Sequence, residues 1–179
     1  KTPEAQQVTP APAQSFPEGP AEVLLLGATG FIGQELARQI LAAGHKLRVL
    51  VRNPGKLPED LRGPGVEVAT GDLTNPEDLK KSLQGIRVVH HLARANVKTW
   101  EEFTEQDIEV TRRVAETCLA LGVKRLIYTG TIDSYYAGAK AGTITEATPL
   151  DPNIARRNLY ARAKAASEDL LMKMHREKG

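Results

Sequence analysis

Residues 23–33 read VLLLGATGFIG, an apolar run typical of a buried strand that leads directly into the start of an amphipathic segment. Gly27 allows a tight turn, Gly30 lets the main chain approach a pyrophosphate closely, and Gly33 lets a helix pack against the strand. Phosphates bind well at the free N–H groups of a helix N-terminus. This stretch therefore predicts a dinucleotide-binding turn, and a tight turn without a ligand is the alternative.

The rest of the chain continues this alternation of short apolar runs with longer amphipathic stretches. The apolar runs predict strands, and the amphipathic stretches predict helices. The expected strands are 22–26, 47–51, 66–70, 88–92 and 125–129, and the expected helices are 32–43, 76–83, 100–121 and 155–177. Because strands that alternate with helices need right-handed crossovers, the sequence predicts an α/β fold with a Rossmann-type doubly wound parallel sheet of at least five strands.

The first 21 residues differ in composition from the remainder. They contain five prolines among Gln, Thr and Ala, which bury too little apolar surface to fold. We predict a disordered Pro-rich tail or linker at 1–21 and one NAD(P)-binding Rossmann domain at 22–179. The chain starts with Lys1 rather than Met, so we expect it to be trimmed or excised from something longer. An upstream domain joined through the linker and a homodimer both stay open.

Composition and charge exclude several classes of partner. The chain of 179 residues has 24 basic and 22 acidic residues, a net charge of +2 and no long basic block, so nucleic acid is not expected. No apolar run approaches the ~20 residues that span a bilayer, and no signal peptide is visible, so no membrane association is expected. A lone Cys118 fits a reducing cytoplasm. His90 and His91 are adjacent on an expected strand and point to opposite faces, so no metal site is predicted.

The glycine spacing G-x-x-G-x-x-G of GATGFIG resembles that of extended short-chain dehydrogenases/reductases, the NAD(P)-dependent epimerase/dehydratase family. Residues 146–152 resemble the stretch before that family's catalytic helix, and Tyr160 and Lys164 match its Tyr-x-x-x-Lys motif. The resemblance covers nearly all of 22–179 but only the cofactor-binding portion of the family. It therefore implies a chain truncated before the C-terminal region that forms most of the substrate pocket.

The residue after the second expected strand bears on the choice of cofactor. NAD-selective sites place an acidic residue there, against the ribose 2′-hydroxyl. This chain has Arg52, whose guanidinium suits a 2′-phosphate, so NADP is predicted, with NAD as the alternative. A solvated Arg52 with no such role is the other interpretation, and Lys56 is a candidate to assist. The resemblance implies that Asp72 accepts a hydrogen bond from the adenine amino group, and a turn or cap role for Asp72 is the alternative.

Tyr160 and Lys164 are four residues apart, which places both on one face of a helix. An ammonium beside a phenol favours the phenolate, so the pair can exchange a proton with a carbonyl or alcohol while the cofactor supplies the hydride. The resemblance implies that Lys164 also holds the nicotinamide ribose. It further implies a strand-end hydroxyl at Thr131 that orients the substrate oxygen, with Ser134 as the substitute; closing the turn is the alternative role for Thr131.

The resemblance implies a larger set of cofactor contacts, at the glycine turn, at the ends of later strands and on the catalytic helix. They are Gly27, Thr29, Gly30, Phe31, Ile32, Gly33, Arg52, Asp72, Leu73, Leu92, Ala93, Tyr160 and Lys164. The chain departs from the family at Asp107, which stands where the family carries an asparagine. If that asparagine supports a proton relay, Asp107 alters the relay or leaves it to water.

Together these features predict an NADP-dependent oxidoreductase or epimerase/dehydratase. Its expected substrate is a small molecule with a reacting hydroxyl or ketone, such as a nucleotide sugar or a flavonol-like or steroid-like compound. The alternatives are a non-catalytic NAD(P)-binding sensor or scaffold module and a fragment inactive without its C-terminal region. The joint presence of Thr131, Tyr160 and Lys164 argues against the sensor.

Overall fold

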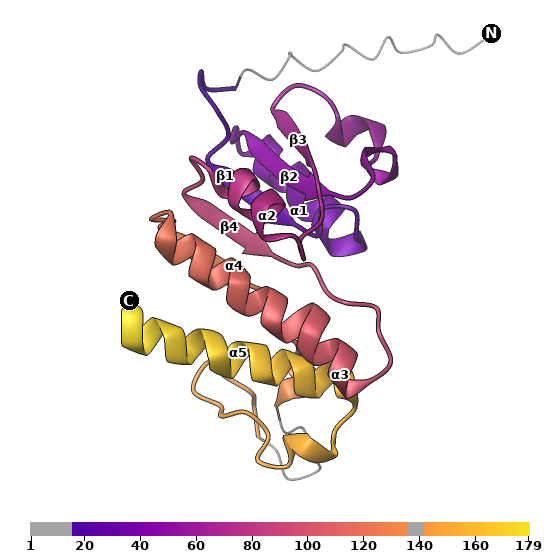
Figure 1. The fold of residues 1–179 in the computed structure, drawn as a ribbon, viewed down its shortest axis with the longest axis vertical. Coiled ribbons are helices and arrows are strands. Elements are labelled where there is room, and N and C mark those ends of the chain that lie inside the picture. The colour runs from indigo at the N-terminus through magenta and orange to yellow at the C-terminus, as the bar shows by residue number, and fades with distance from the viewer. Residues whose placement is uncertain (1–15, 136–141) are drawn as a thin grey trace, which may run out of the picture.

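The computed structural model describes residues 16–135 and 142–179 (Figure 1). Five parallel strands form one sheet in the order β3-β2-β1-β4-β5. The strands are β1 Val23–Leu26, β2 Leu47–Val51, β3 Val66–Thr70, β4 Val88–His91 and β5 Arg125–Tyr128. The predicted Rossmann-type sheet is confirmed, and each expected strand agrees with the observed one to within a residue at either end.

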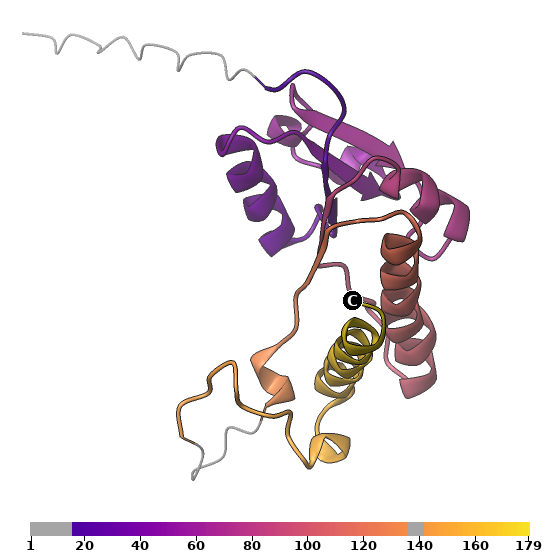
Figure 2. The same cartoon turned by 90° about the vertical axis from the view of Figure 1, so that its left-hand side faces the viewer.

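Helices cover both faces of this sheet. They are α1 Phe31–Ala42, α2 Pro76–Leu83, α3 Trp100–Phe103, α4 Glu109–Ala120 and α5 Leu159–Lys178. Figure 2 shows α1 on one side of the sheet and α2 and α4 on the other, with α5 beside α4. No helix in the described ranges is both long enough and apolar enough to cross a bilayer.

Alternate residues of the central strands enter two separate cores, which explains why these strands are apolar at almost every position. Leu24 and Val89 pack with residues of α2 and α4 in one cluster. Leu25 and Val49 pack with residues of α1 in the other. The sheet is therefore buried from both sides at β1 and β2. Its outer strand β5 is more open, and Ile127 is 37% exposed.

Two helix predictions need correction. The helix expected at 100–121 is interrupted, because Thr104–Ile108 form a π-helical turn between α3 and α4. The helix expected from residue 155 begins only at Leu159. Asn158 caps it, since its side-chain oxygen accepts a hydrogen bond from the Ala161 N–H at 2.8 Å. The four residues ahead of this cap belong to a separate 3₁₀ turn and its flank.

The described residues before β1 lie against the domain. Phe16 packs on the cluster beneath α1, and its ring fills the space beside Gly65. Ala21 is fully buried and its N–H donates to Glu67 at 2.7 Å. Packing thus extends six residues ahead of the expected boundary at 22, and residues 1–15 of the expected linker lie outside the described residues.

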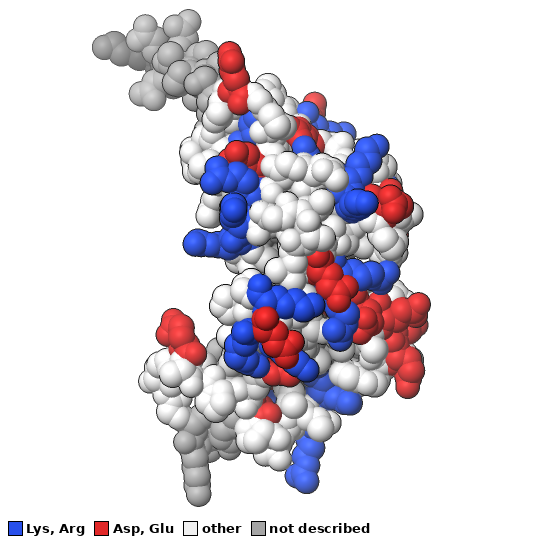
Figure 3. All heavy atoms as spheres, turned by 60° about the vertical axis from the view of Figure 1, so that its left-hand side comes forward, with Lys and Arg blue, Asp and Glu red and all other residues white. Residues whose placement is uncertain are grey.

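Charged side chains are mixed over the surface. On the face seen in Figure 3, Lys and Arg lie among Asp and Glu rather than in one basic patch. This distribution agrees with the small net charge of +2.

Candidate functional site

Because every strand is parallel, the carboxyl ends of all five strands meet at one edge of the sheet, called here the carboxyl edge. β1 lies between β2 and β4. The strands that follow β1 are therefore added first on one side of it, as β2 and β3, and then on the other side, as β4 and β5. In open α/β sheets this switch point is where ligands bind. The glycine turn leaves β1 at this point, and Leu92 and Ala93 leave β4 next to it.

Glycine is required at two positions of the turn. Gly27 has a φ of +98°, and a Cβ there would lie 2.7 Å from the Ala93 nitrogen. A Cβ on Gly33 would lie 2.1 Å from the Gly27 carbonyl oxygen. Both clashes are with main chain, which cannot move aside as a flexible side chain can. The turn therefore packs closely against both the loop after β4 and the first turn of α1.

The first turn of α1 is open to solvent. Gly30 is the N-cap residue, and no side chain caps the helix there. Phe31 is 94% exposed and Ile32 is 61% exposed. Uncapped N–H groups at the positive end of a helix favour an anion such as a phosphate. The two exposed apolar side chains beside them would bury apolar surface on contact with a bound aromatic or ribose ring, which is favourable.

Arg52 and Asp72 stand at the next two strand ends, close enough for the Arg52 charge to help lower the Asp72 pKa. The larger cause of that lowered pKa is a hydrogen bond from the Thr74 N–H to Asp72 at 2.8 Å. Asp72 thus performs the turn role, through one carboxylate oxygen. Within the described ranges Arg52 makes no hydrogen bond or ion pair, so its guanidinium is available to a ligand. Leu73 packs against the core.

Lys164 lies one turn after Tyr160 on α5 and is only 2% exposed. Its Nζ lies 4.7 Å from the centroid of the Tyr128 ring, at the end of β5. Burial lowers the pKa of Lys164, while the nearby Asp107 charge raises it. Asp107 itself is 2% exposed, and one of its carboxylate oxygens has no partner within the described part of the chain. Burial raises the pKa of Asp107, and Lys164 and Arg94 both lower it.

Tyr160 is half-buried at the carboxyl edge and packs against the cluster that contains Phe103 and Ile108. Arg94 leaves the β4 loop and places its guanidinium carbon 5.5 Å from the Tyr160 ring centroid. Sequence reasoning missed Arg94. The available signal was its place directly after Leu92 and Ala93, both of which were expected at the cofactor.

The structure does not link Thr131 to the pair by a hydrogen bond. Its hydroxyl accepts from the Asp133 N–H at 3.3 Å and caps the 3₁₀ turn Ile132–Ser134. Ser134 is fully buried and donates to the Ala161 carbonyl at 3.3 Å, so it holds the turn against α5. Of the three expected catalytic residues, Tyr160 and Lys164 share the helix α5. Thr131 lies shortly after the end of β5.

The buried end of β4 holds a neutral histidine. His91 is 1% exposed, its Nε2 lies 3.1 Å from the Thr111 hydroxyl, and its Nδ1 has no partner among the described residues. Burial, followed by the Lys164 charge, lowers the pKa of His91 to about 3. His91 therefore places an uncharged imidazole ring near Lys164.

Acidification is expected to destabilise the domain through His91. Below the unfolded-state pKa of about 6.5, the unfolded chain binds a proton at this position that the folded chain excludes. Stability therefore falls as the pH drops from about 6.5 towards 3, by up to about 1.4 kcal/mol per pH unit. Urea unfolding at pH 7 and pH 5 measures this loss, and His91→Gln should reduce it. The same change at the exposed His45 is the matched control; equal pH dependence in all three proteins would exclude this role of His91.

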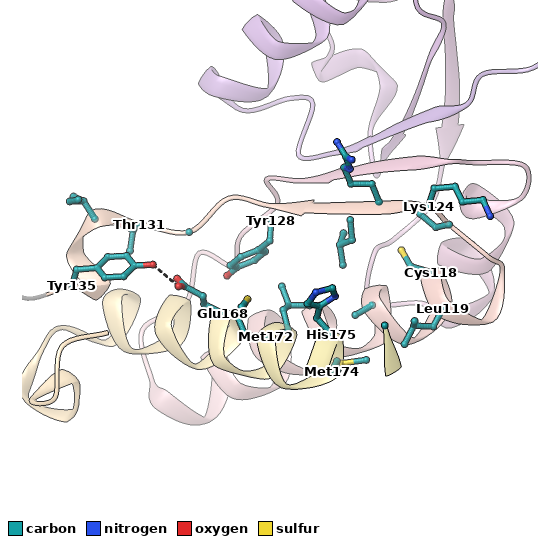
Figure 4. A pocket seen from close by; sticks show the side chains of 18 residues that line it. Cys118, Leu119, Lys124, Tyr128, Thr131, Tyr135, Glu168, Met172, Met174 and His175 are labelled. Atoms are coloured by element: carbon teal, nitrogen blue, oxygen red, sulfur yellow. Dashed lines mark hydrogen bonds between the residues drawn. The ribbon is translucent and has the colours of Figure 1, made fainter. Parts of the chain in front are cut away.

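A groove of about 820 Å³ lies between α4, α5 and β5 (Figure 4). Tyr128, Thr131 and Met172 are among its lining residues, and the Tyr135 hydroxyl donates to Glu168 at one end. Its lining includes neither the glycine turn nor the Tyr160 and Lys164 pair. The candidate site is therefore the carboxyl edge and not this groove.

Comparison with known proteins agrees with this geometry. The chain is 31% identical over 155 residues to the 2-alkyl-3-oxoalkanoate reductase of Shewanella oneidensis, covering 85% of this chain and 38% of that protein. It is 32% identical over 129 residues to the decarboxylating sterol-4-alpha-carboxylate 3-dehydrogenase of Mus musculus, covering 70% of this chain and 34% of that protein. The chain thus spans well under half the length of these relatives.

A solved structure shows the same fold. The dTDP-glucose 4,6-dehydratase DesIV from Streptomyces venezuelae, with NAD and TYD bound, superposes with a TM-score of 0.73 and 27% identity. The alignment covers 86% of this chain and 51% of that one. The profile of the NAD dependent epimerase/dehydratase family matches residues 23–179. The resemblance drawn from the glycine turn is therefore confirmed, and the chain belongs to the NAD dependent epimerase/dehydratase family.

Proposed function

We propose that this chain is the cofactor-binding part of an NADP-dependent oxidoreductase or epimerase/dehydratase that acts on a hydroxyl or oxo group with Tyr160 as the acid/base. The observation that supports the proposal is that Tyr160 and the buried Lys164 lie one turn apart on α5, with Tyr160 beside Arg94 of the loop that follows β4. A phenol and a buried lysine one helical turn apart are suited to proton transfer.

The glycine turn fits a pyrophosphate. Side chains are excluded at Gly27 and Gly33, and the uncapped start of α1 offers its N–H groups. Phe31 and Ile32 would cover the flanks of the cofactor, and Leu92 and Ala93 would lie on the side of β4. When bound, NADP supplies or accepts the hydride.

Residues of this chain would carry out the proton transfer. The Tyr160 hydroxyl would give a proton to the oxygen of a carbonyl substrate, or take one from an alcohol. Lys164 would hold its ammonium beside Tyr160 and stabilise the phenolate, and Asp107 favours the charged form of Lys164. Thr131 would orient the substrate oxygen only if its hydroxyl left the Asp133 N–H. The neutral His91 would keep a second positive charge away from Lys164.

Arg52 supports NADP over NAD, because it is exposed, lacks a partner in the described ranges and stands where an acidic residue would select NAD. In calorimetric titrations, Arg52→Gln should weaken NADPH binding at least about tenfold, since a charge-assisted hydrogen bond contributes about 1.5–3 kcal/mol. NADH binding should change by less than about twofold, because NADH has no 2′-phosphate. Arg125→Gln, which removes an exposed arginine at the opposite edge of the sheet, is the matched control. Equal losses for both cofactors would exclude a 2′-phosphate contact.

The relatives' names suggest the chemistry at the reacting carbon. One is a 3-oxoalkanoate reductase and the other a 3-dehydrogenase of a sterol carboxylate. Both names describe oxidation or reduction at an oxygen-bearing carbon of a largely apolar molecule. An apolar hydroxy or oxo compound is therefore favoured here over a nucleotide sugar, the substrate named for DesIV.

A non-catalytic NADP-binding module is the second candidate. Its support is the Thr131 hydroxyl, which is occupied by a cap within the turn. Turnover separates the two functions, because a module would bind NADPH without oxidising it in the presence of any oxo compound.

A further inference from the structure

Charged side chains from three elements lie around Tyr160 and Lys164. Arg94 and Lys164 are the cations, from the β4 loop and from α5, and both act electrostatically on the same acid, Asp107. Asp107 forms no ion pair within 4 Å with either cation, and burial raises its pKa. His91 is buried and neutral, and Tyr128 is partly buried with a raised pKa. Glu168, one turn after Lys164, also acts on Tyr128, so two acids and two cations lie around this position.

Arg94 is the cation with an accessible head group. Lys164 is buried, whereas Arg94 is exposed. In the described part of the chain, the Arg94 guanidinium makes no hydrogen bond and no ion pair, and its one recorded contact is with the ring of Tyr160 at 5.5 Å. A second arginine that contacts a ring, Arg162, lies closer to its partner Trp100, at 4.2 Å. The donors of Arg94 therefore have no partner among the described residues and lie beside the Tyr160 ring.

A carboxylate is the group that these donors fit best. The planar guanidinium presents parallel N–H groups that bind both oxygens of a carboxylate at once. Because Arg94 lies beside the Tyr160 ring, a carboxylate bound to it would lie near the carbon that reacts.

We propose that Arg94 binds the carboxylate of the substrate, and that the substrate class is therefore 2- or 3-hydroxy acids and the corresponding oxo acids. The proposal rests on the proposed function for the reaction at Tyr160, and it adds the group that selects the substrate. A neutral ester or ketone of the same shape would leave the Arg94 charge unpaired and would be the poorer substrate.

The test uses the complete protein, NADP⁺, and 3-hydroxydecanoate paired with its methyl ester. We expect wild type to prefer the acid in kcat/KM, and Arg94→Gln to lower the value for the acid at least about tenfold, as the loss of a charge-assisted contact implies. The value for the ester should stay within about twofold, and so should the Kd for NADPH. Arg94→Lys keeps the positive charge but lacks the paired N–H donors of the guanidinium, so it should recover part of the lost kcat/KM for the acid.

The matched control is Arg162→Gln, which removes the other ring-bound arginine and should leave the preference for the acid intact. Equal losses for acid and ester would overturn the proposal. A loss of NADPH affinity with an unchanged acid preference would also overturn it, because it would assign Arg94 to a cofactor phosphate.

If the protein turned over neither compound, that result would count against the proposed function alone. The carboxylate site would then be tested by ligand binding. Calorimetry with decanoate and methyl decanoate on the NADPH-loaded protein then decides. Decanoate that binds wild type but not Arg94→Gln would support the carboxylate site. Decanoate that binds both proteins equally, or neither, would overturn it.

Discussion

Replacing Tyr160 by phenylalanine is expected to lower kcat of the complete protein by about 10²- to 10⁴-fold, the usual contribution of a positioned acid/base. The change removes one hydroxyl and leaves the ring that packs near Phe103 and under Arg94. The fold and the glycine turn are untouched, so the Kd for NADPH should stay within about twofold of wild type. The measurement is the steady-state rate of NADPH oxidation, together with a calorimetric titration.

The control for this prediction is Tyr135→Phe. The Tyr135 hydroxyl donates to Glu168 of α5, and Tyr135 lines the groove between α4, α5 and β5. Its loss should leave kcat within about twofold, because its hydroxyl is already bonded to Glu168. If Tyr160→Phe retained wild-type turnover, the assignment of the acid/base would be wrong even with cofactor binding intact.

Gly33→Ala is expected to remove most NADPH binding. A Cβ at this position would lie 2.1 Å from the carbonyl oxygen of Gly27 and 2.9 Å from its carbonyl carbon. Relief requires α1 to move away from the turn, which displaces the N–H groups that would hold the pyrophosphate. Overpacking of this kind costs about 1–3 kcal/mol of unfolding free energy, and we expect the NADPH Kd to rise at least about tenfold.

The matched control is Gly63→Ala, since a Cβ on Gly63 would meet nothing within 4 Å and Gly63 has no positive φ. That variant should unfold within about 0.5 kcal/mol of wild type and bind NADPH normally. Thermal and urea unfolding of both variants separate a local displacement of α1 from general unfolding. Normal NADPH affinity in a folded Gly33→Ala protein would show that the turn does not hold the cofactor.

Several features of the fold were predictable because each has a local signature. Strands buried on both faces are apolar along their whole length, as β1 is, and such runs stand out between amphipathic stretches. α2 begins at Pro76 after the capping residue Asn75, a pairing that is a local signal of a helix start. The positions after each strand were informative as well, since parallel strands bring Gly27, Arg52 and Asp72 to one edge.

Other features depend on contacts that no short stretch of sequence reveals. The π-helical turn at Thr104–Ile108 has the same composition as an ordinary helix, yet it buries Asp107 near Lys164. No local pattern marks Arg94, because its contact with the Tyr160 ring joins the loop after β4 to α5. The resemblance implies Thr131 from its position after β5, and it does not reveal that the hydroxyl accepts a hydrogen bond from the Asp133 N–H.

The most direct test of the central claim is a calorimetric titration of this 179-residue chain with NADPH and, separately, with NADH. The glycine turn, the uncapped start of α1 and the unpaired Arg52 together predict saturable binding of one NADPH per chain, tighter than that of NADH. Absence of heat with either nucleotide from a folded chain would contradict the cofactor site, and tighter binding of NADH would contradict the role of Arg52.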